Sequence, residues 1–387
     1  MPLLFAISLV CFCASISARV LDPMVPAIAR DLLVAPATAA LLASAFAFPF
    51  AFGQPLLGPL GDALGKARVI KGCLAVLTLA LGASALAADF GQLFVARIAS
   101  GVASGGISPL AFALVADRVP PARRQVALSR VLAAALVGQL AGAIGSGLIA
   151  ARAGWRLVLA LAATATLIAL LVAVLKLAPR PGAVRTRFTL AGLRTGYRKV
   201  FANPRAPICY GTVFTEGLAI FGVMPFVALM LEANQAGGMQ EAGFVLAGLG
   251  IGGLVFTSFI GFMLSRVGTF GLIRYGGLLA GSGLAAAALV HSWPAEFAAF
   301  TLIGLGFYMM HNSVQNQVME LAPDARGAAV SMHAFSFFLG QASGPVVYGF
   351  GASAIGLDKT LLIAAAVVGL LGIVSAAAFI NLAPSQD

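Results

Sequence analysis

The sequence predicts an all-α integral membrane protein in which twelve transmembrane helices form two pseudo-symmetric six-helix bundles. Of its 387 residues, 60% are hydrophobic and 10% are charged, whereas soluble domains carry about 25% charged residues. The apolar residues form continuous runs of about 20 residues, the length at which a helix crosses the hydrocarbon core. They do not alternate with polar residues as in a membrane β-barrel. Short motifs of the first half recur in the second half, which predicts the two bundles.

The twelve expected helices are separated by short polar segments. They cover residues 3–28, 38–57, 69–88, 93–115, 129–151, 156–177, 207–231, 242–264, 271–290, 296–317, 329–352 and 358–381. The first apolar run lacks the basic residues that precede the core of a cleavable signal sequence, so we expect it to be retained as a helix. The predicted domains are an N-terminal bundle over 1–177, a linker over 178–206 and a C-terminal bundle over 207–387.

The internal repeat has an offset of 202 or 203 residues. It pairs Gly58…Asp62…Gly65 with Gly261…Ser265…Gly268, Pro121…Arg124…Ser129 with Pro323…Arg326…Ser331, and Gly138-Gln139…Gly142 with Gly340-Gln341…Gly344. Because each half contains an even number of helices, both halves have the same orientation in the membrane, which is a parallel repeat.

Basic residues gather on one predicted side of the membrane. Most of the 24 Lys and Arg residues lie in alternate loops, and seven of them lie in the linker, which contains no acid. The excess of positive charge predicts that both termini and the linker are cytoplasmic. Within the linker, Phe188, Leu193, Tyr197 and Phe201 recur at helical spacing among the arginines, which predicts an amphipathic helix on the membrane surface.

The same features exclude several other classes of protein. The net charge of +11 follows the expected topology and does not indicate nucleic acid. The four cysteines lie in apolar runs without the spacing of a zinc site or a disulfide framework. The motifs of zinc proteases, serine hydrolases and phosphate-binding loops do not occur. We therefore expect no enzyme activity, no metal and no cofactor.

Charged side chains are costly inside a bilayer, so each is a candidate for function. The candidates for proton coupling are Arg19, Asp22, Arg97 and Glu216. Arg19 and Asp22 lie three residues apart on one helix face, and a permanent ion pair that locks the helix is the alternative interpretation. Glu216 is open to three interpretations: a titrating group, an anchor for a cationic substrate, or a carboxylate hydrogen-bonded within the bundle.

The candidates for substrate binding lie in the seventh and tenth expected helices. They are Phe221, Met224, Tyr308, His311, Asn312 and Asn316. The apolar members are equally typical of ordinary core packing. His311 and His333 could titrate near neutral pH or serve as hydrogen-bonded polar residues, and the amides could join helices.

Three motifs resemble those of the major facilitator superfamily. The segment from Gly58 to Arg68, G-x-L-x-D-x-x-G-K-x-R, resembles the signature loop between the second and third helices of these transporters. Asp22-Pro23-Met24-Val25-Pro26 resembles the D-x-x-x-P element in the first helix of its drug:proton antiporters. Arg97, with Gly101 and Gly105 following at helical spacing, resembles their fourth-helix motif. The resemblance covers essentially the whole chain.

The resemblance implies a central cavity lined by the first, fourth, seventh and tenth helices. It implies that Asp22 takes and gives the proton while Arg97 tunes it, because desolvation and a nearby guanidinium act oppositely on a buried carboxylate. Gly138-x-x-x-Gly142 and its second-half copy Gly340-x-x-x-Gly344 resemble the fifth-helix motif of the antiporters. One feature departs from the family: the proline after the second glycine is replaced by Ala143, whereas Pro345 keeps that place in the eleventh helix.

The resemblance also implies a cytoplasmic latch around the signature loop. Its members are Gly58, Asp62, Gly65, Lys66, Arg68, Asp117 and Arg118. Asp62 would meet the positive end of the eleventh helix near Val330. The family's arginine after this aspartate is replaced by Ala63, and Ser265 replaces the acid in the second copy. We therefore expect a weaker latch than is usual in the family.

The expected function is proton-coupled export of a small organic solute or drug across the bacterial inner membrane by alternating access, carried out by a monomer. The expected partners are the solute, protons and the lipid bilayer. A facilitator or a proton symporter that imports a metabolite shares every feature except the direction of coupling. A channel or a sensor is the further alternative, which the two-half repeat and the buried charges disfavour.

Overall fold

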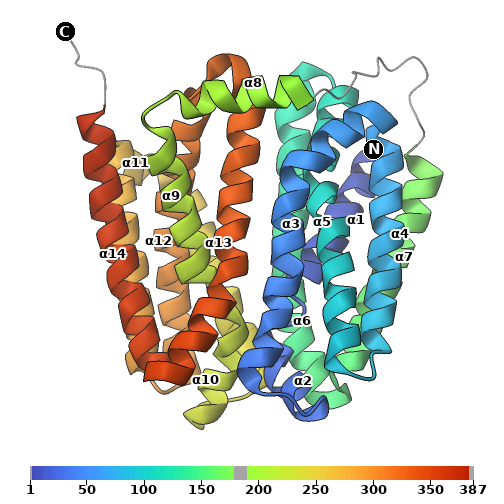
Figure 1. Ribbon diagram of the computed structural model, residues 1–387, viewed down its shortest axis with the longest axis vertical. Coiled ribbons are helices and arrows are strands. Elements are labelled where there is room, and N and C mark those ends of the chain that lie inside the picture. The colour runs from blue at the N-terminus through green and yellow to red at the C-terminus, as the bar shows by residue number, and fades with distance from the viewer. Residues whose placement is uncertain (1, 178–189, 383–387) are drawn as a thin grey trace. The chain divides into compact units, whose positions relative to one another are not determined.

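The computed structural model describes residues 2–177 and 190–382, and all regular structure within these ranges is helical. The all-α prediction is therefore confirmed. The chain divides into two compact units, Met1–Thr189 and Leu190–Asp387, and Figure 1 shows the helices of each unit running side by side.

Over residues 2–177, the part that the structure describes, the first unit contains seven α-helices and one short 3₁₀ turn. They are α1 (Pro2–Arg19), η1 (Asp22–Met24), α2 (Val25–Asp31), α3 (Pro36–Leu64), α4 (Lys66–Ala85), α5 (Phe90–Arg118), α6 (Pro121–Ala153) and α7 (Trp155–Lys176). Within this unit α1 packs on α5, α6 and α7, α3 packs on α5, and α4 packs on α5 and α7.

The second unit contains the remaining helices. They are α8 (Leu190–Phe201), α9 (Ala206–Glu216), the π-helix η2 (Gly217–Phe221), the 3₁₀ turn η3 (Met224–Phe226), α10 (Val227–Ala233), α11 (Met239–Leu289), α12 (Trp293–Glu320), the 3₁₀ turn η4 (Pro323–Ala325), α13 (Arg326–Ile355) and α14 (Leu357–Asn381). Here α11 packs on α12 and α14, and α13 packs on α9 and η2.

Ten described helical stretches are long and apolar enough to cross a membrane. One of them, α11, is 51 residues long and is interrupted at Gly268, whose φ of 67° and ψ of 177° are not helical. The 30-residue helix α13 lies outside those ten but is long enough to cross. Counting both limbs of α11 and adding α13 gives the twelve expected crossings.

The first crossing of each unit is broken at the same place. In the first unit the break is the 3₁₀ turn Asp22–Met24, followed by α2 over Val25–Asp31. In the second unit it is Met224–Phe226, followed by α10 over Val227–Ala233, at an offset of 202 residues. Each turn has a proline at its second residue. Since proline lacks an amide N–H and clashes with the preceding turn, it interrupts the helix at both sites.

The segment from Gly58 to Arg68 is not the loop that the sequence predicts. Helix α3 continues to Leu64 and α4 begins at Lys66, so one residue, Gly65, separates them. Gly65 has a φ of 97°, a conformation that glycine adopts without steric cost. The polar residues of the signature motif therefore lie on helix ends.

Glycines allow the backbones of several helix pairs to touch. A side chain at Gly138 of α6 would collide with the backbone of Phe12 in α1, and one at Gly142 would collide with the backbone of Ile16. A side chain at Gly340 of α13 would likewise meet the backbone of α9 at Phe214. Small residues at such positions are typical of helix association in membranes, so these glycines fix the pairs α1–α6 and α9–α13.

The amphipathic segment expected between the halves includes α8, which lies across the end of the second unit where α9 begins (Figure 1). Val200 is buried there, Phe201 contacts Tyr210, and Lys199 lies 3.9 Å from Asp324. Residues 178–189, the first part of the expected linker, lie outside the described residues.

Charge is distributed unequally between the two ends of the second unit. The end that holds α8 carries the basic residues Arg194, Arg198, Lys199, Arg205 and Arg326 together with the acidic residues Glu320 and Asp324. The opposite end carries the acidic residues Glu232, Glu241, Glu296 and Asp358 together with the basic residue Lys359. Along the axis of this unit, an excess of positive charge therefore lies at one membrane face and an excess of negative charge at the other.

Candidate functional site

A charged cluster lies at the break of the first crossing. Arg19 is the last residue of α1 and Asp22 the first residue of η1. Their side chains form an ion pair with 3.4 Å between Nη1 of Arg19 and Oδ2 of Asp22. The carboxylate side chain is 6% exposed and the guanidinium side chain 15% exposed. The pair therefore lies almost entirely within the protein.

Arg97 of α5 completes this cluster. Its Nη1 donates a hydrogen bond of 3.2 Å to the carbonyl oxygen of Ser17, and its guanidinium lies 4.4 Å from the centroid of the Phe46 ring. The residue is 1% exposed, and its Nε has no hydrogen-bond partner among the described residues. The charges of Arg97 and Asp22 interact. Asp22 therefore pairs with Arg19 and has the guanidinium of Arg97 in its neighbourhood.

The neighbouring helices hold Arg97 in place through close packing. A side chain at Gly101, one turn further along α5, would collide with the carbonyl group of Phe46 in α3. The resulting approach of α3 to α5 brings the Phe46 ring over the guanidinium. A cation on an aromatic face is stabilised by about 0.5–2 kcal/mol, which offsets part of the cost of burying the charge.

A second ionisable cluster lies in the C-terminal unit. Oε2 of Glu216, the last residue of α9, lies 2.7 Å from Nδ1 of His311 in α12. Glu216 is 0% exposed, and its Oε1 has no partner among the described residues. The His311 ring centroid lies 4.8 Å from that of His333 in α13. Three helices of the unit therefore contribute one titratable group each.

Phenylalanine rings surround this second cluster. Phe307, one turn before His311, lies 4.8 Å from its ring, and Phe337 of α13 lies 4.9 Å from it. Phe221 of the π-helix lies 5.0 Å from Phe307 and 5.2 Å from Phe337. These offset and edge-to-face contacts are the arrangements that aromatic pairs prefer. Together they form an apolar wall around the imidazole that contacts the carboxylate.

The remaining residues expected to bind substrate fall in different places. Phe221 and His311 belong to the cluster just described, and Met224 is buried in η3. Tyr308 packs with the core around Phe256 on the α11 side of α12. Asn312 is half-buried and Asn316 is exposed. The structure therefore brings Phe221 together with His311, whereas the Tyr308 ring packs with the core around Phe256 and touches this cluster through Phe307, whose ring centroid is 5.0 Å away.

The expected latch residues lie at the ends of α3, α4 and α5. Nζ of Lys66, the first residue of α4, lies 2.6 Å from Oδ2 of Asp117 near the end of α5. Arg68 is exposed and Arg118 is half-buried. The side-chain surroundings of Gly58 and Asp62 lie outside what the structure describes. The contact of Asp62 with the region of Val330 stays a prediction.

Sequence reasoning missed a polar cluster at the opposite end of the first unit. Asp31, at the end of α2, accepts a hydrogen bond of 3.1 Å from Nε1 of Trp155 and pairs with Arg156. The guanidinium of Arg156 lies 4.2 Å from the Trp155 ring centroid and donates to the carbonyl oxygen of Ala87. This cluster joins three helix connections, and a cavity of about 520 Å³ opens beside it. A tryptophan beside an arginine at a helix end was the available signal.

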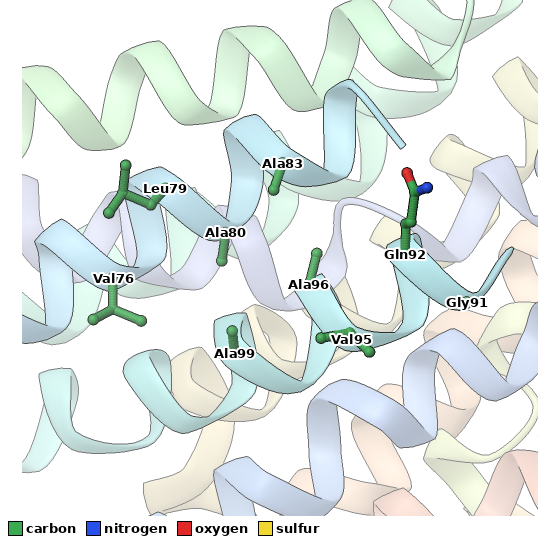
Figure 2. Close-up of a pocket in the computed structure, with 9 residues that line it drawn as sticks. All are labelled: Val76, Leu79, Ala80, Ala83, Gly91, Gln92, Val95, Ala96 and Ala99. Atoms are coloured by element: carbon green, nitrogen blue, oxygen red, sulfur yellow. The ribbon is translucent and has the colours of Figure 1, made fainter. Parts of the chain in front are cut away.

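An apolar groove of about 730 Å³ lies between α4 and α5, and Figure 2 shows its lining. It is lined by Val76, Leu79, Ala80, Ala83, Gly91, Gln92, Val95, Ala96 and Ala99. Alanine and glycine residues create the hollow, and the amide of Gln92 is its polar end. The groove contains none of the ionisable residues of the two clusters.

The model of the Major Facilitator Superfamily matches residues 7–345 of the chain, with a second match over 209–387. The chain belongs to the Major Facilitator Superfamily. The second match begins near the start of α9, where the repeated half of the chain begins. Family and fold are those of membrane transporters and not of enzymes.

Two relatives illustrate the similarity in sequence. Multidrug resistance protein 1 of Bacillus subtilis (strain 168) is 23% identical over 339 residues, which cover 87% of this chain and 86% of that protein. A chloramphenicol resistance protein of Streptomyces lividans is 31% identical over 157 residues, 40% of each chain.

Solved structures show the same fold. A bacterial homologue of the human lysosomal transporter Spinster, in an inward-facing and unoccupied conformation, has a TM-score of 0.79 and 17% identity, and the match covers 100% of this chain and 98% of that one. A mutant of the nucleoside transporter NupG has a TM-score of 0.80 and 15% identity, and the match covers 99% of this chain and 100% of that one.

Proposed function

We propose that this transporter couples the movement of protons to the export of a small organic solute or drug across the bacterial inner membrane. Asp22 is the group that takes and releases the proton, and Arg97 and Arg19 tune its charge. Alternating access of the two units supplies the transport cycle.

The observation that carries the proposal is the buried cluster of Arg19, Asp22 and Arg97. A carboxylate that is buried within a membrane segment is costly when charged, and here two guanidinium groups offset that cost. A proton on Asp22 leaves those cations without their anion. Binding and release of one proton therefore change the electrostatics at the break between α1 and α2.

The names of two relatives support the direction of transport, and the distribution of charge supports the orientation in the membrane. Two relatives are named for multidrug resistance and for chloramphenicol resistance, and a membrane transporter protects a cell from a drug by moving it outward. The basic residues gather at the α8 end of the second unit, and the positive-inside rule assigns that end to the cytoplasm. Export from the cytoplasm, with both termini on that side, is consistent with both observations.

Transport by Asp22→Asn in sealed vesicles with opposed pH gradients tests the proposal. The probe is radiolabelled chloramphenicol, with ethidium as a cationic second probe. We expect the wild-type protein to move a probe against its gradient when protons flow the other way, and we expect Asp22→Asn to lose this coupling. The control is Glu320→Gln, an exposed residue at the end of α12. Coupling that survives Asp22→Asn would make the Arg19–Asp22 pair a structural lock.

The same vesicles separate the other functions. Uptake that follows the proton gradient inward identifies a symporter, and movement that equilibrates without the gradient identifies a facilitator. Flux that does not saturate and is unaffected by an uncoupler identifies a channel. The absence of any flux across a broad panel of solutes favours a sensor.

A further inference from the structure

The second ionisable cluster contains a carboxylate that is sealed from solvent. The side chain of Glu216 is 0% exposed, whereas the side chain of His311, which contacts it, is 18% exposed. The aromatic residues Phe221 and Phe307 of the surrounding wall are buried. The imidazole of His311 is therefore the polar connection between the carboxylate and the surface of the unit.

This geometry selects for a very small ligand. An organic cation would have to displace His311 and open the phenylalanine wall before it could contact Glu216. A proton can pass along the existing hydrogen bond, because the imidazole takes a proton on one ring nitrogen and gives one from the other. The 2.7 Å separation between Nδ1 of His311 and Oε2 of Glu216 is suited to that transfer.

The other polar groups of this region come from three helices that pack on α9 or η2, namely α12, α13 and α14. Helix α12 contributes His311, and α13 contributes His333 and Gln341, whose backbone amide lies against Gly217 and whose Oε1 is buried without a partner among the described residues. Helix α14 contributes the hydroxyl of Ser375, which is bonded to Thr212 of α9. Among the described residues, no Lys or Arg forms an ion pair with Glu216. The ionisable side chain in hydrogen-bond contact with it is the imidazole of His311, a group that is itself titratable.

Two polar atoms of this cluster make no hydrogen bond to any described residue. Oε1 of Glu216 and Nε2 of His333 have no hydrogen-bond partner among the described residues, and both are buried. A buried polar atom without a partner is unfavourable, because it has lost its hydrogen bond to water. A proton on Glu216 turns one carboxylate oxygen into a donor, and a proton on Nε2 of His333 would do the same there, so protonation changes which contacts the cluster can make.

The carboxylate lies directly before the π-helix Gly217–Phe221. Short π-helical segments are rare in proteins, and those that occur are often found at functional sites. A side chain at Gly217 would collide with the carbonyl oxygen of Phe337 and the amide nitrogen of Gln341 in α13. A change of charge on Glu216 therefore acts where the first crossing of the unit changes its helical register and touches α13.

We propose that Glu216 and His311 form a second proton-binding site in the C-terminal unit, with His311 as the residue through which the proton reaches Glu216 and His333 as its neighbour. The proton moves from water to the outer nitrogen of His311, while the proton on Nδ1 of His311 moves to Oε2 of Glu216. Release follows the reverse order, so the imidazole is regenerated. The proposal rests on the proposed proton coupling and places a further proton in the same cycle.

Infrared difference spectroscopy of the purified full-length protein in lipid nanodiscs, between acidic and alkaline buffer, tests the site directly. We expect a protonated-carboxyl C=O band that is lost in Glu216→Gln and shifts in frequency in His311→Gln, because the hydrogen-bond partner is removed. Asp22→Asn should leave this band in place. If Glu216→Gln does not fold, Glu216→Asp keeps the carboxyl group but moves it away from His311, and the band must shift. A spectrum unchanged by these substitutions overturns the proposal.

A cation-binding role has a different outcome. Tetraphenylphosphonium that binds the wild-type protein and fails to bind Glu216→Gln, with no titrating band from Glu216, would make the carboxylate a substrate anchor and overturn the proton site. Loss of coupling in Asp22→Asn vesicles together with an absent Glu216 band overturns this inference alone. A titrating Glu216 band together with unchanged coupling in Asp22→Asn overturns the proposed role of Asp22 alone.

Discussion

Tyr348 shows how a single side chain supports an irregular helix. Its hydroxyl donates a hydrogen bond of 2.7 Å to the carbonyl oxygen of Ala219, within the π-helix, and the residue is 1% exposed. In a bilayer the backbone groups freed by an irregular turn must find partners inside the protein. Tyr348 supplies one of these partners from α13.

We expect Tyr348→Phe to lower the free energy of unfolding by about 1–3 kcal/mol, because it leaves a buried carbonyl group with one partner fewer. Thermal unfolding of the purified protein in detergent measures the effect. Tyr275→Phe removes a hydroxyl from a residue that is 50% exposed and should leave the midpoint unchanged. An equal midpoint for wild type and Tyr348→Phe would mean that the hydroxyl does not support the π-helix.

Individual ionisable residues and the local pair Arg19–Asp22 could be found from the sequence, but partners far away in the chain could not. Glu216 and His311 stand out because charged or titratable residues are rare in apolar runs. Their contact joins residues 95 positions apart, and no local pattern records such a pairing. Asp31 and Arg156 were missed for a related reason: charged residues at helix ends are ordinary, so only the contact with Trp155 distinguishes them.

At the scale of helices, glycine determines which pairs touch. Gly138 of α6 lies against the backbone of α1 at Phe12, whereas Gly145 of the same helix has nothing within 4 Å of an added side chain. The two positions have the same helical context and opposite surroundings. They form a matched pair for measuring what close approach contributes.

We expect Gly138→Ala to destabilise the protein by about 1–3 kcal/mol, because the added methyl group forces α1 and α6 apart. Gly145→Ala should have no such cost and can gain stability from the higher helix propensity of alanine. Unfolding midpoints of the two variants in the same detergent make the comparison. Equal midpoints would show that α1 and α6 adjust without loss.

The helices themselves follow from apolar runs of sufficient length, which is why all twelve crossings could be predicted. The residues at which the helices end depend on local backbone conformation, which is harder to predict. The polar residues after Leu57 predict a loop, yet α3 continues to Leu64 because one glycine at Gly65 is enough for the turn into α4. The π-helix could not be predicted either, since it depends on contacts with α13 that lie far away in the sequence.

For the whole molecule, the distribution of charge predicts the orientation in the membrane. Basic residues are in excess at the α8 end of the second unit, and acidic residues are in excess at its other end. Arg198 and Lys359 are exposed residues at these opposite ends. The positive-inside rule assigns Arg198 to the cytoplasm and Lys359 to the other side.

A thiol reagent that does not cross membranes can test this orientation in intact cells. We expect Lys359→Cys to be labelled from outside and Arg198→Cys to be labelled only after the cells are opened. The unmodified chain is a suitable background, because Cys11, Cys13 and Cys209 are buried and Cys73 is half-buried within a crossing. The reverse pattern would place the termini outside and overturn the expected topology.

The two broken crossings have one more consequence. The residue that corresponds to Asp22, 202 positions later, is Met224. Both begin a 3₁₀ turn that has a proline at its second residue and leads into a seven-residue helix. The break in the first crossing therefore forms both with a carboxylate side chain and with a thioether side chain at its first residue. The substitution Asp22→Met gives the first unit the uncharged residue that the second unit has at the same position. It removes the charge of Asp22 from a turn that the second unit forms without one, so the effect of the charge can be measured separately from the effect of the break in the helix.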